Sequence, residues 1–294
     1  MRLSRFLVFA GLTLIALTLP LAAAADHGTR PHTKNIHALG HSPHAASFFG
    51  VISAQRNINS DIAFWENYVI HGNYDGFRIL RDAPGNPKEI SWTHCNGDQG
   101  DIVVWENIVV RAWNSPAPAG RFCDGAPVPP GFEGVHIFDI SNVEDPVLVG
   151  QLPLDCGSHT LTAIPDLALN RLIVYNQTSG GRTLPDGTFD PCNYITIFAV
   201  PLAAPGTAAV INKEPLMEDH ACHDSGVILG SVNKMVCASG DMTNVFDIGA
   251  NEIPGGSPED PVWLFNIMEP GVCGGGSGDD VPCNGNWHSA AWSW

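Results

Sequence analysis

The chain has 294 residues, and its 14 Lys and Arg against 30 Asp and Glu give a formal net charge of -16. Such an acidic surface repels phosphate backbones, which excludes nucleic acid as an expected partner. After the first 25 residues no apolar run is long enough for a membrane-crossing helix, so we expect no membrane span.

The N-terminus has the parts of a secretory signal peptide. Two arginines, Arg2 and Arg5, precede an apolar run from Phe6 to Leu21, which leads into a stretch of four alanines that ends at Ala25. This arrangement predicts cleavage after Ala25 and export to the extracellular space or the periplasm. Residues 26–58 form an N-terminal arm, in which Ile36–Ser42 is a candidate for a strand that closes a ring.

The rest of the chain, residues 59–294, reads as one repeated unit. "DIAFWEN" at residues 61–67 returns as "DIVVWEN" at residues 101–107, and each copy is followed by further short runs of β-branched and aromatic residues. Two more units open near His159 and His223, each again with four such runs, and a last one opens at "WHSAAWSW". The approximate unit boundaries are 59–93, 94–155, 156–217, 218–270 and 284–294, the last of these partial.

An asparagine stands between the first and second runs of each complete unit, at Asn67, Asn107, Asn170 and Asn233. Asn tolerates the positive φ that a tight hairpin needs, so we expect a chain reversal at each of these positions. Units of about forty residues with four strands each are typical of β-propeller blades. The predicted fold class is all-β: an incomplete propeller of four-stranded antiparallel blades, about four blades plus the first strand of a fifth.

The segment "GVHIFDISNVEDPVLVG" at residues 134–150, with weaker echoes in "GFRILRD" and "TNVFDIG", resembles the repeat of LVIVD-repeat proteins. The resemblance covers about residues 40–294 and implies a secreted or surface propeller, while it implies little about activity. Four blades and one strand do not close a ring, so we interpret the sequence as a C-terminally truncated form of a longer propeller.

The eight cysteines all follow the signal peptide, and an even number in an oxidising compartment predicts disulfides. In a four-stranded blade, the start of the first strand and the connection from the second to the third strand lie on one face, which we call the upper face. Cysteines at these places predict two disulfides across that face. A third bond would tie the start of the fourth unit to its second strand, and a fourth would close a glycine-rich loop. The predicted pairs are Cys95–Cys123, Cys156–Cys192, Cys222–Cys237 and Cys273–Cys283.

The positions just before the first strands give the candidate site. They carry Asp or His in every unit, and equivalent positions of first strands form a ring around a propeller axis. Imidazoles and carboxylates are the usual ligands of divalent transition metals. The candidate metal ligands are His94, Asp101, His159, His223, Asp224 and His288. The competing interpretation is structural, since such residues also cap turns and join hydrogen-bond networks within a blade.

Three functions remain open from the sequence. The first is a binding or interaction module whose upper-face loops contact an unidentified protein or small-molecule ligand. The second is a metal-dependent enzyme, for instance an oxidoreductase, with the histidines and aspartates around an axial metal; no catalytic residue is identified for it. The third is a carbohydrate-binding surface, for which Trp92, Trp113, Trp287, Trp292 and Trp294 are candidate stacking platforms.

Overall fold

The computed structural model describes residues 58–82, 87–178, 180–184, 186–216, 222–230, 232–239, 242–249, 255–268 and 288–291. The expected signal peptide, the closing strand at residues 36–42 and the Cys273–Cys283 bond lie outside the described residues. Within the described part of the chain, no helix is long and apolar enough to cross a membrane.

The structure is all-β and is built from four antiparallel sheets of four strands each. Sheet 1 contains β1 (Asn59–Trp65), β2 (Tyr68–Asn73), β3 (Gly76–Arg81) and β4 (Lys88–His94). Sheet 2 contains β5 (Ile102–Trp105), β6 (Ile108–Trp113), β9 (Gly134–Asp139) and β10 (Val147–Pro153). Sheet 3 contains β11 (Thr160–Asp166), β12 (Arg171–Gln177), β15 (Tyr194–Pro201) and β16 (Ala209–Pro215). Sheet 4 contains β17 (Asp224–Ile228), β18 (Lys234–Ser239), β19 (Met242–Asp247) and β20 (Val262–Met268).

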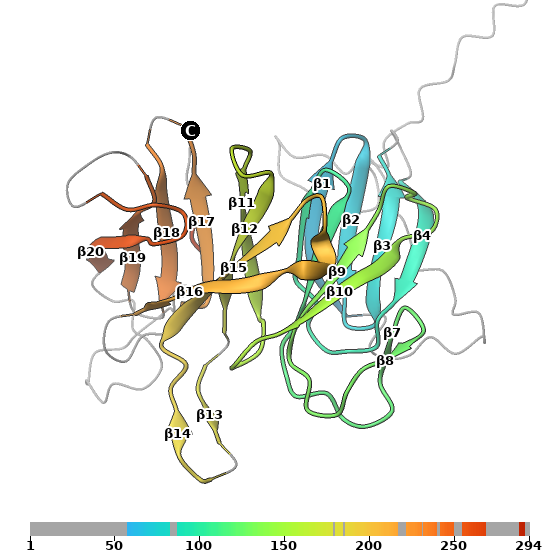
Figure 1. Ribbon diagram of the computed structural model, residues 1–294, viewed down its shortest axis with the longest axis horizontal. Helices are drawn as coiled ribbons and strands as arrows, with labels where there is room; N and C mark the ends of the chain where they lie inside the picture. The colour runs from blue at the N-terminus through green and yellow to red at the C-terminus, as the bar shows by residue number, and fades with distance from the viewer. Residues whose placement is uncertain are drawn as a thin grey trace, which may run out of the picture.

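Each sheet is a meander whose strands neighbour one another in chain order. The first strands of successive sheets contact one another: β1 contacts β5, β5 contacts β11 and β11 contacts β17. Figure 1 shows the sheets following one another from the blue β1–β4 to the orange β17–β20. The row of sheets does not close into a ring within the described ranges.

Near-continuous apolar runs explain why neighbouring sheets pack face to face. Alternate side chains of a strand point to opposite faces. On β6, Ile108, Val110 and Ala112 pack against sheet 3, whereas Val109 and Trp113 pack against sheet 1. On β12, Leu172 and Val174 pack toward sheet 2, and Ile173 and Tyr175 toward sheet 4. Both faces of sheets 2 and 3 are therefore covered, which is what an uninterrupted hydrophobic strand requires.

The four asparagines occupy equivalent turns, as the sequence predicts. Each Asn carbonyl accepts a hydrogen bond from the backbone N–H of the residue just after the third strand of its own sheet. The pairs are Asn67 with Asp82, Asn107 with Ile140, Asn170 with Leu202 and Asn233 with Ile248, at 2.7–3.0 Å. The expected positive φ occurs at Asn170 and Asn233, but in sheets 1 and 2 the prediction is wrong. There the preceding residues, Glu66 and Glu106, both have a φ of 51°. In each of these two-residue turns the first residue reverses the chain.

A 3-10 turn at Pro205–Thr207 precedes β16, and Pro suits the first turn of a helix. One further detail differs from the sequence-based expectation. The partial fifth unit contributes no strand among the described residues. Its residues 288–291 lie against β17, where a Cβ added to Gly226 would meet the Ala290 carbonyl oxygen at 2.5 Å.

Two insertions extend the connections between second and third strands. One carries the hairpin β7 (Phe122–Cys123) with β8 (Ala126–Pro127), and the other carries β13 (Arg182–Thr183) with β14 (Phe189–Asp190). Both hairpins project from the upper face, which points downward in Figure 1.

Candidate functional site

Three disulfides hold the described part of the upper face together, and all three are predicted pairs. They are Cys95–Cys123, Cys156–Cys192 and Cys222–Cys237. The first two each tie the segment before a first strand to the insertion of the same sheet. The insertions are therefore anchored at the end of the sheets where the first strands begin.

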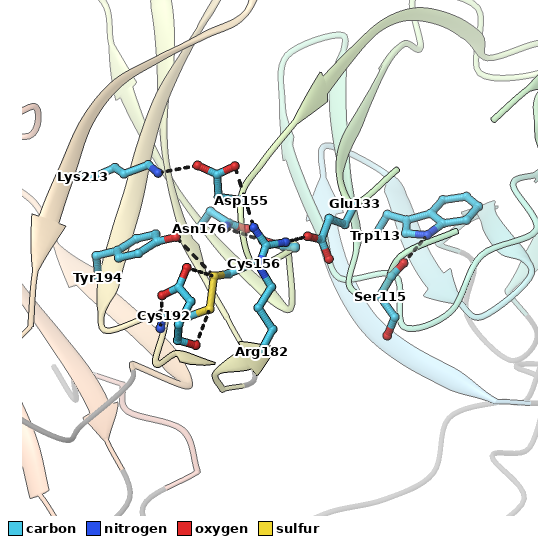
Figure 2. Close-up of polar contacts among 12 residues, drawn as sticks. Trp113, Ser115, Glu133, Asp155, Cys156, Asn176, Arg182, Cys192, Tyr194 and Lys213 are labelled. Atoms are coloured by element: carbon cyan, nitrogen blue, oxygen red, sulfur yellow. Dashed lines mark hydrogen bonds and ion pairs between the residues drawn. A yellow bond between two sulfur atoms is a disulfide. The ribbon is translucent and has the colours of Figure 1, made fainter. Parts of the chain in front are cut away.

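Figure 2 shows how the second insertion is fixed. Arg182, on β13, forms an ion pair with Glu133 and reaches toward Asp155, which also binds the Lys213 ammonium at 2.7 Å. The Tyr194 hydroxyl lies 3.2 Å from the Cys156 sulfur. Residues from sheet 2 and sheet 3 thus hold one insertion in place, which gives the upper face a defined shape.

The starts of the first strands are joined across sheets by a repeated set of hydrogen bonds. Asp61 Oδ2 accepts the N–H of Ile102 at 3.1 Å, and Asp101 Oδ2 accepts the N–H of Leu161 at 2.7 Å. In the same way, the Thr160 hydroxyl donates to the His223 carbonyl at 2.5 Å. Each side chain therefore reaches the next first strand and caps its backbone. These residues therefore have the structural, hydrogen-bonding role that the sequence analysis gave as the alternative to metal binding. The strand that each one caps belongs to the neighbouring sheet and not to its own.

Two of the predicted histidines meet directly. The Nε2 atoms of His159 and His223 lie 3.0 Å apart, and the His223 Nδ1–H donates to the His288 carbonyl at 3.0 Å. The ring centres of His223 and His288 are 4.0 Å apart. We call the set Asp61, Asp101, His159, His223, Asp224 and His288 the axial cluster.

The hydrogen bonds fix the tautomers of the neutral histidines. Because the His223 Nδ1 carries the proton that binds the His288 carbonyl, its Nε2 accepts, and the proton between the two rings belongs to His159. The His159 Nδ1 is then a buried acceptor that has no hydrogen-bond partner among the described residues. Burial, with the neighbouring imidazoles adding to it, lowers the pKa of His159 to about 4, and the pKa of His223 is lowered for the same reasons.

The carboxylates of the cluster interact with one another. Burial raises the pKa of Asp101 well above its usual range, and the charges of Asp61 and Asp224 raise it further. Burial is also the main cause of the raised pKa of Asp61. No Lys or Arg of the described residues forms an ion pair with these three carboxylates.

The remaining candidates lie elsewhere or are differently bonded. His94 Nδ1 lies 3.3 Å from Asp75 Oδ2, and its side chain is 53% exposed. Trp113 is buried in the core at 1% exposure, so it is no sugar-stacking platform; Trp287, Trp292 and Trp294 lie outside the described residues. Asp61 is the one cluster member that the predicted ligand set omits, although its position before a first strand marks it as equivalent to Asp101.

Among the described residues, two groups of three ligand atoms lie within 4.8 Å of one another, Cys95/Cys123/His136 and Cys156/Asp190/Cys192, and no three residues of the axial cluster lie as close. In both groups the two cysteines are joined in a disulfide. Thiolates bind metals, whereas a disulfide has no thiolate to offer. We therefore assign no metal to either group, and the axial cluster is the candidate site.

Neither a family model nor a curated protein matches the chain. Solved structures similar to it include the computationally designed Ika4 protein, at 13% identity and a TM-score of 0.39, over 68% of this chain and 96% of that one. A functionally unknown protein from Desulfotomaculum acetoxidans DSM 771 shares 9% identity at a TM-score of 0.40, over 77% and 74% of the two chains. Apo AztD from Citrobacter koseri shares 13% identity at a TM-score of 0.30, over 73% and 72%. Each TM-score is below 0.5, so these similarities carry no functional argument.

Proposed function

We propose that the four sheets are blades of an incomplete β-propeller and that the chain is an exported binding module for a divalent transition-metal ion. The disulfides support export, because such bonds persist in oxidising compartments. The contacts of β1, β5, β11 and β17 with one another support the blade arrangement. A relation to LVIVD-repeat proteins remains part of this proposal.

One observation carries the metal assignment. Three imidazoles and three carboxylates gather where the first strands begin, and none of the carboxylates has a basic ion-pair partner among the described residues. Like charges brought together without a counter-ion disfavour their ionised forms. A bound dication would supply the missing positive charge next to the two imidazole nitrogens.

The distance between two of the imidazoles supports this proposal. Two imidazole nitrogens bound to one tetrahedral zinc ion lie roughly 3.3 Å apart. The Nε2 atoms of His159 and His223 are 3.0 Å apart, so a small separation of the rings makes room for the ion. The His223 Nδ1–H already donates to a backbone carbonyl, as the second nitrogen of a metal-bound histidine usually does. Binding requires the His159 proton to move from Nε2 to Nδ1.

His288 is exposed and stacks on His223, from where rotation of its side chain brings a third imidazole to the ion. Asp224, next to His223 in the chain, is the nearest carboxylate in sequence, and Asp101 and Asp61 balance the charge. We propose binding and not a reaction, because no described side chain of this cluster shows a nucleophile with its own base.

Titration calorimetry of the chelator-treated protein with Zn²⁺ or Co²⁺ tests the proposal. We expect one ion per chain, and a loss of affinity of at least a hundredfold in the His159→Ala, His223→Ala double variant. The matched control is His94→Ala, an exposed histidine paired with Asp75, which should bind as the parent does.

The N-terminal arm holds four more histidines, His32, His37, His41 and His44, that can bind metal adventitiously. A variant with these four changed to Gln must keep the tight site. Equal binding by the parent and the folded double variant, or no binding by the parent, would overturn the assignment.

A further inference from the structure

A cavity of about 610 Å³ opens between sheets 1 and 2, at the end of the strands opposite to the axial cluster. Both copies of the Trp-Glu-Asn motif contribute to it: Trp65 and Glu66 from the first copy, Glu106 and Asn107 from the second. Tyr68 and Ser141 complete its polar and aromatic lining. A volume of this size lies within the range of small-molecule sites.

Two aromatic side chains, Trp65 and Tyr68, line the cavity together with the aliphatic Ile70, Ile140 and Val143. Trp65 packs on Trp105 with ring centres 5.2 Å apart, so its indole is held in place and half-buried. The guanidinium carbon of Arg81 lies 6.0 Å from the centre of the Tyr68 ring, which shows that this ring already attracts a cation. Aromatic faces of this kind favour positively charged groups.

Both charged groups of the lining are carboxylates. Glu66 and Glu106 each occupy the first position of a hairpin turn with a φ of 51°, and both are exposed at the rim. No Lys or Arg of the described chain forms an ion pair with either. The cavity therefore presents about two negative charges beside aromatic rings.

One hydrogen-bond donor of the lining is already used within the protein. The Asn107 amide N–H₂ already donates to Asp139 Oδ1 at 3.1 Å and to Ser141 Oγ at 2.8 Å. The charged groups of the lining, Glu66 and Glu106, are acceptors, which favours a ligand that donates hydrogen bonds.

The equivalent space between sheets 3 and 4 provides a comparison within the same molecule. A cavity of about 330 Å³ there is lined by Asp166, Arg171 and Glu259. Arg171 forms ion pairs with both acids, at 2.8 Å to Asp166. In that cavity a basic side chain pairs with the acids. Between sheets 1 and 2, Arg81 lies over the Tyr68 ring, but no Lys or Arg of the described residues pairs with Glu66 or Glu106.

Because two carboxylates lie beside aromatic rings in this cavity, we propose that the cavity between the two Trp-Glu-Asn motifs is a binding site for an organic cation, an alkylated or protonated amine. The ammonium group lies between the Glu66 and Glu106 carboxylates, and its alkyl groups contact Trp65 and Tyr68. The site is separate from the axial cluster and does not depend on a metal there.

Choline and its uncharged carbon analogue 3,3-dimethyl-1-butanol are suitable probes, since they have the same shape and differ in charge. Binding to the full chain is followed by quenching of tryptophan fluorescence and by calorimetry, in the presence of a chelator so that the axial site plays no part. We expect saturable binding of choline, at least fivefold weaker binding of the neutral analogue, and weaker choline binding as salt is added.

Glu66→Gln and Glu106→Gln keep the side-chain shape and should each weaken choline binding by about 2- to 5-fold, and the double variant by roughly the product. The matched control is Glu144→Gln, an exposed glutamate outside the lining, which should change nothing. The proposal is overturned by equal affinity for the two probes, by an unchanged double variant, or by preferential binding of methyl glucoside. If the double variant unfolds, the comparison of the two probes on the parent chain still decides.

Discussion

The Nε2 atoms of His159 and His223 lie 3.0 Å apart although 64 residues separate them in the chain. Each imidazole stands just before the first strand of its own sheet, and the sheets pack side by side. A repeated sheet therefore gathers equivalent side chains from distant segments at one end of the molecule. This is the physical basis of the axial cluster.

The carboxylate repulsion in this cluster predicts an effect on stability. In Asp101→Asn the amide oxygen still accepts the Leu161 N–H, while the charge that Asp61 and Asp224 disfavour is gone. We expect the free energy of unfolding at pH 7, with chelator present, to rise by on the order of 1 kcal/mol. Asp101→Ala loses the hydrogen bond and should lower it by about 1–3 kcal/mol.

Denaturant unfolding of both variants shows whether the free energy of unfolding rises in Asp101→Asn and falls in Asp101→Ala. The control Asp145→Asn removes an exposed carboxylate elsewhere and should leave stability within about 0.5 kcal/mol of the parent. A less stable Asp101→Asn protein would show that the repulsion is not the dominant energy at this position.

Much of the fold follows from the sequence because each strand has a local signal. The strands of each sheet appear as short β-branched runs, and the turns appear as asparagines. Two predicted disulfides, Cys95–Cys123 and Cys156–Cys192, needed only the rule that segments before first strands and the second-to-third connections share a face. These signals depend on neighbours within one sheet, which the chain order reveals.

What the sequence does not show are the contacts between sheets. Arg111 reads as the polar end of a strand, yet it is fully buried and its Nη2 donates to the carbonyls of Asn73 and Asp98. Burial lowers its pKa to about 10. The turn position of Glu66 and the cavity beside it also depend on how sheets 1 and 2 stack. No short stretch of sequence encodes that stacking.

His136 predicts a pH dependence. It is buried at 0% exposure between Trp113 and Phe132, and within the described part of the chain neither ring nitrogen has a hydrogen-bond partner. Burial, and then the charge of Arg111, lower its pKa from 6.5 to about 3. Between these values the unfolded chain binds a proton that the folded chain does not, so stability falls as the pH is lowered through this window.

Replacing His136 with Phe removes the contribution of this histidine to the pH dependence of stability. We expect the loss of unfolding free energy between pH 7 and pH 4 to be smaller in His136→Phe than in the parent by roughly 3 kcal/mol. Urea unfolding at several pH values measures it, and all other groups titrate alike in the two proteins. Parallel pH curves would contradict the assignment of a neutral buried histidine.

The disulfides should differ in their contributions. Cys156–Cys192 closes a separation of 36 residues and Cys222–Cys237 one of 15 residues. Loop-closure entropy predicts a cost of about 4 kcal/mol for removing the first and about 3 kcal/mol for the second, as Cys→Ala pairs. Thermal and denaturant unfolding under oxidising conditions compare them. Loss of the first should also speed amide exchange in β13 and β14, whereas an unchanged exchange rate there would show that Arg182 alone holds the insertion.

The third strands of sheets 1 and 2 begin with glycines in a backbone conformation that other residues rarely adopt. Gly134 has a φ of 142°, and a Cβ added to it would lie 2.2 Å from the Leu152 carbonyl oxygen; Gly76, at 138°, would meet the Thr93 carbonyl oxygen at 1.9 Å. In both places the third and fourth strands approach so closely that a side chain must push the pair apart.

We therefore expect Gly134→Ala to lower the free energy of unfolding by about 3 kcal/mol or more, from strain and from the broken strand pair. The matched control is Gly125→Ala, at a φ of 73° with no atom within 4 Å of the added Cβ. In Gly125→Ala the free energy of unfolding should fall only by the cost of holding Ala in a left-handed backbone conformation, about 1–2 kcal/mol. Denaturant unfolding separates the two effects. Equal losses in the two variants would mean that the β9–β10 pair yields to the new methyl group, and that the close approach of the strands contributes little to stability.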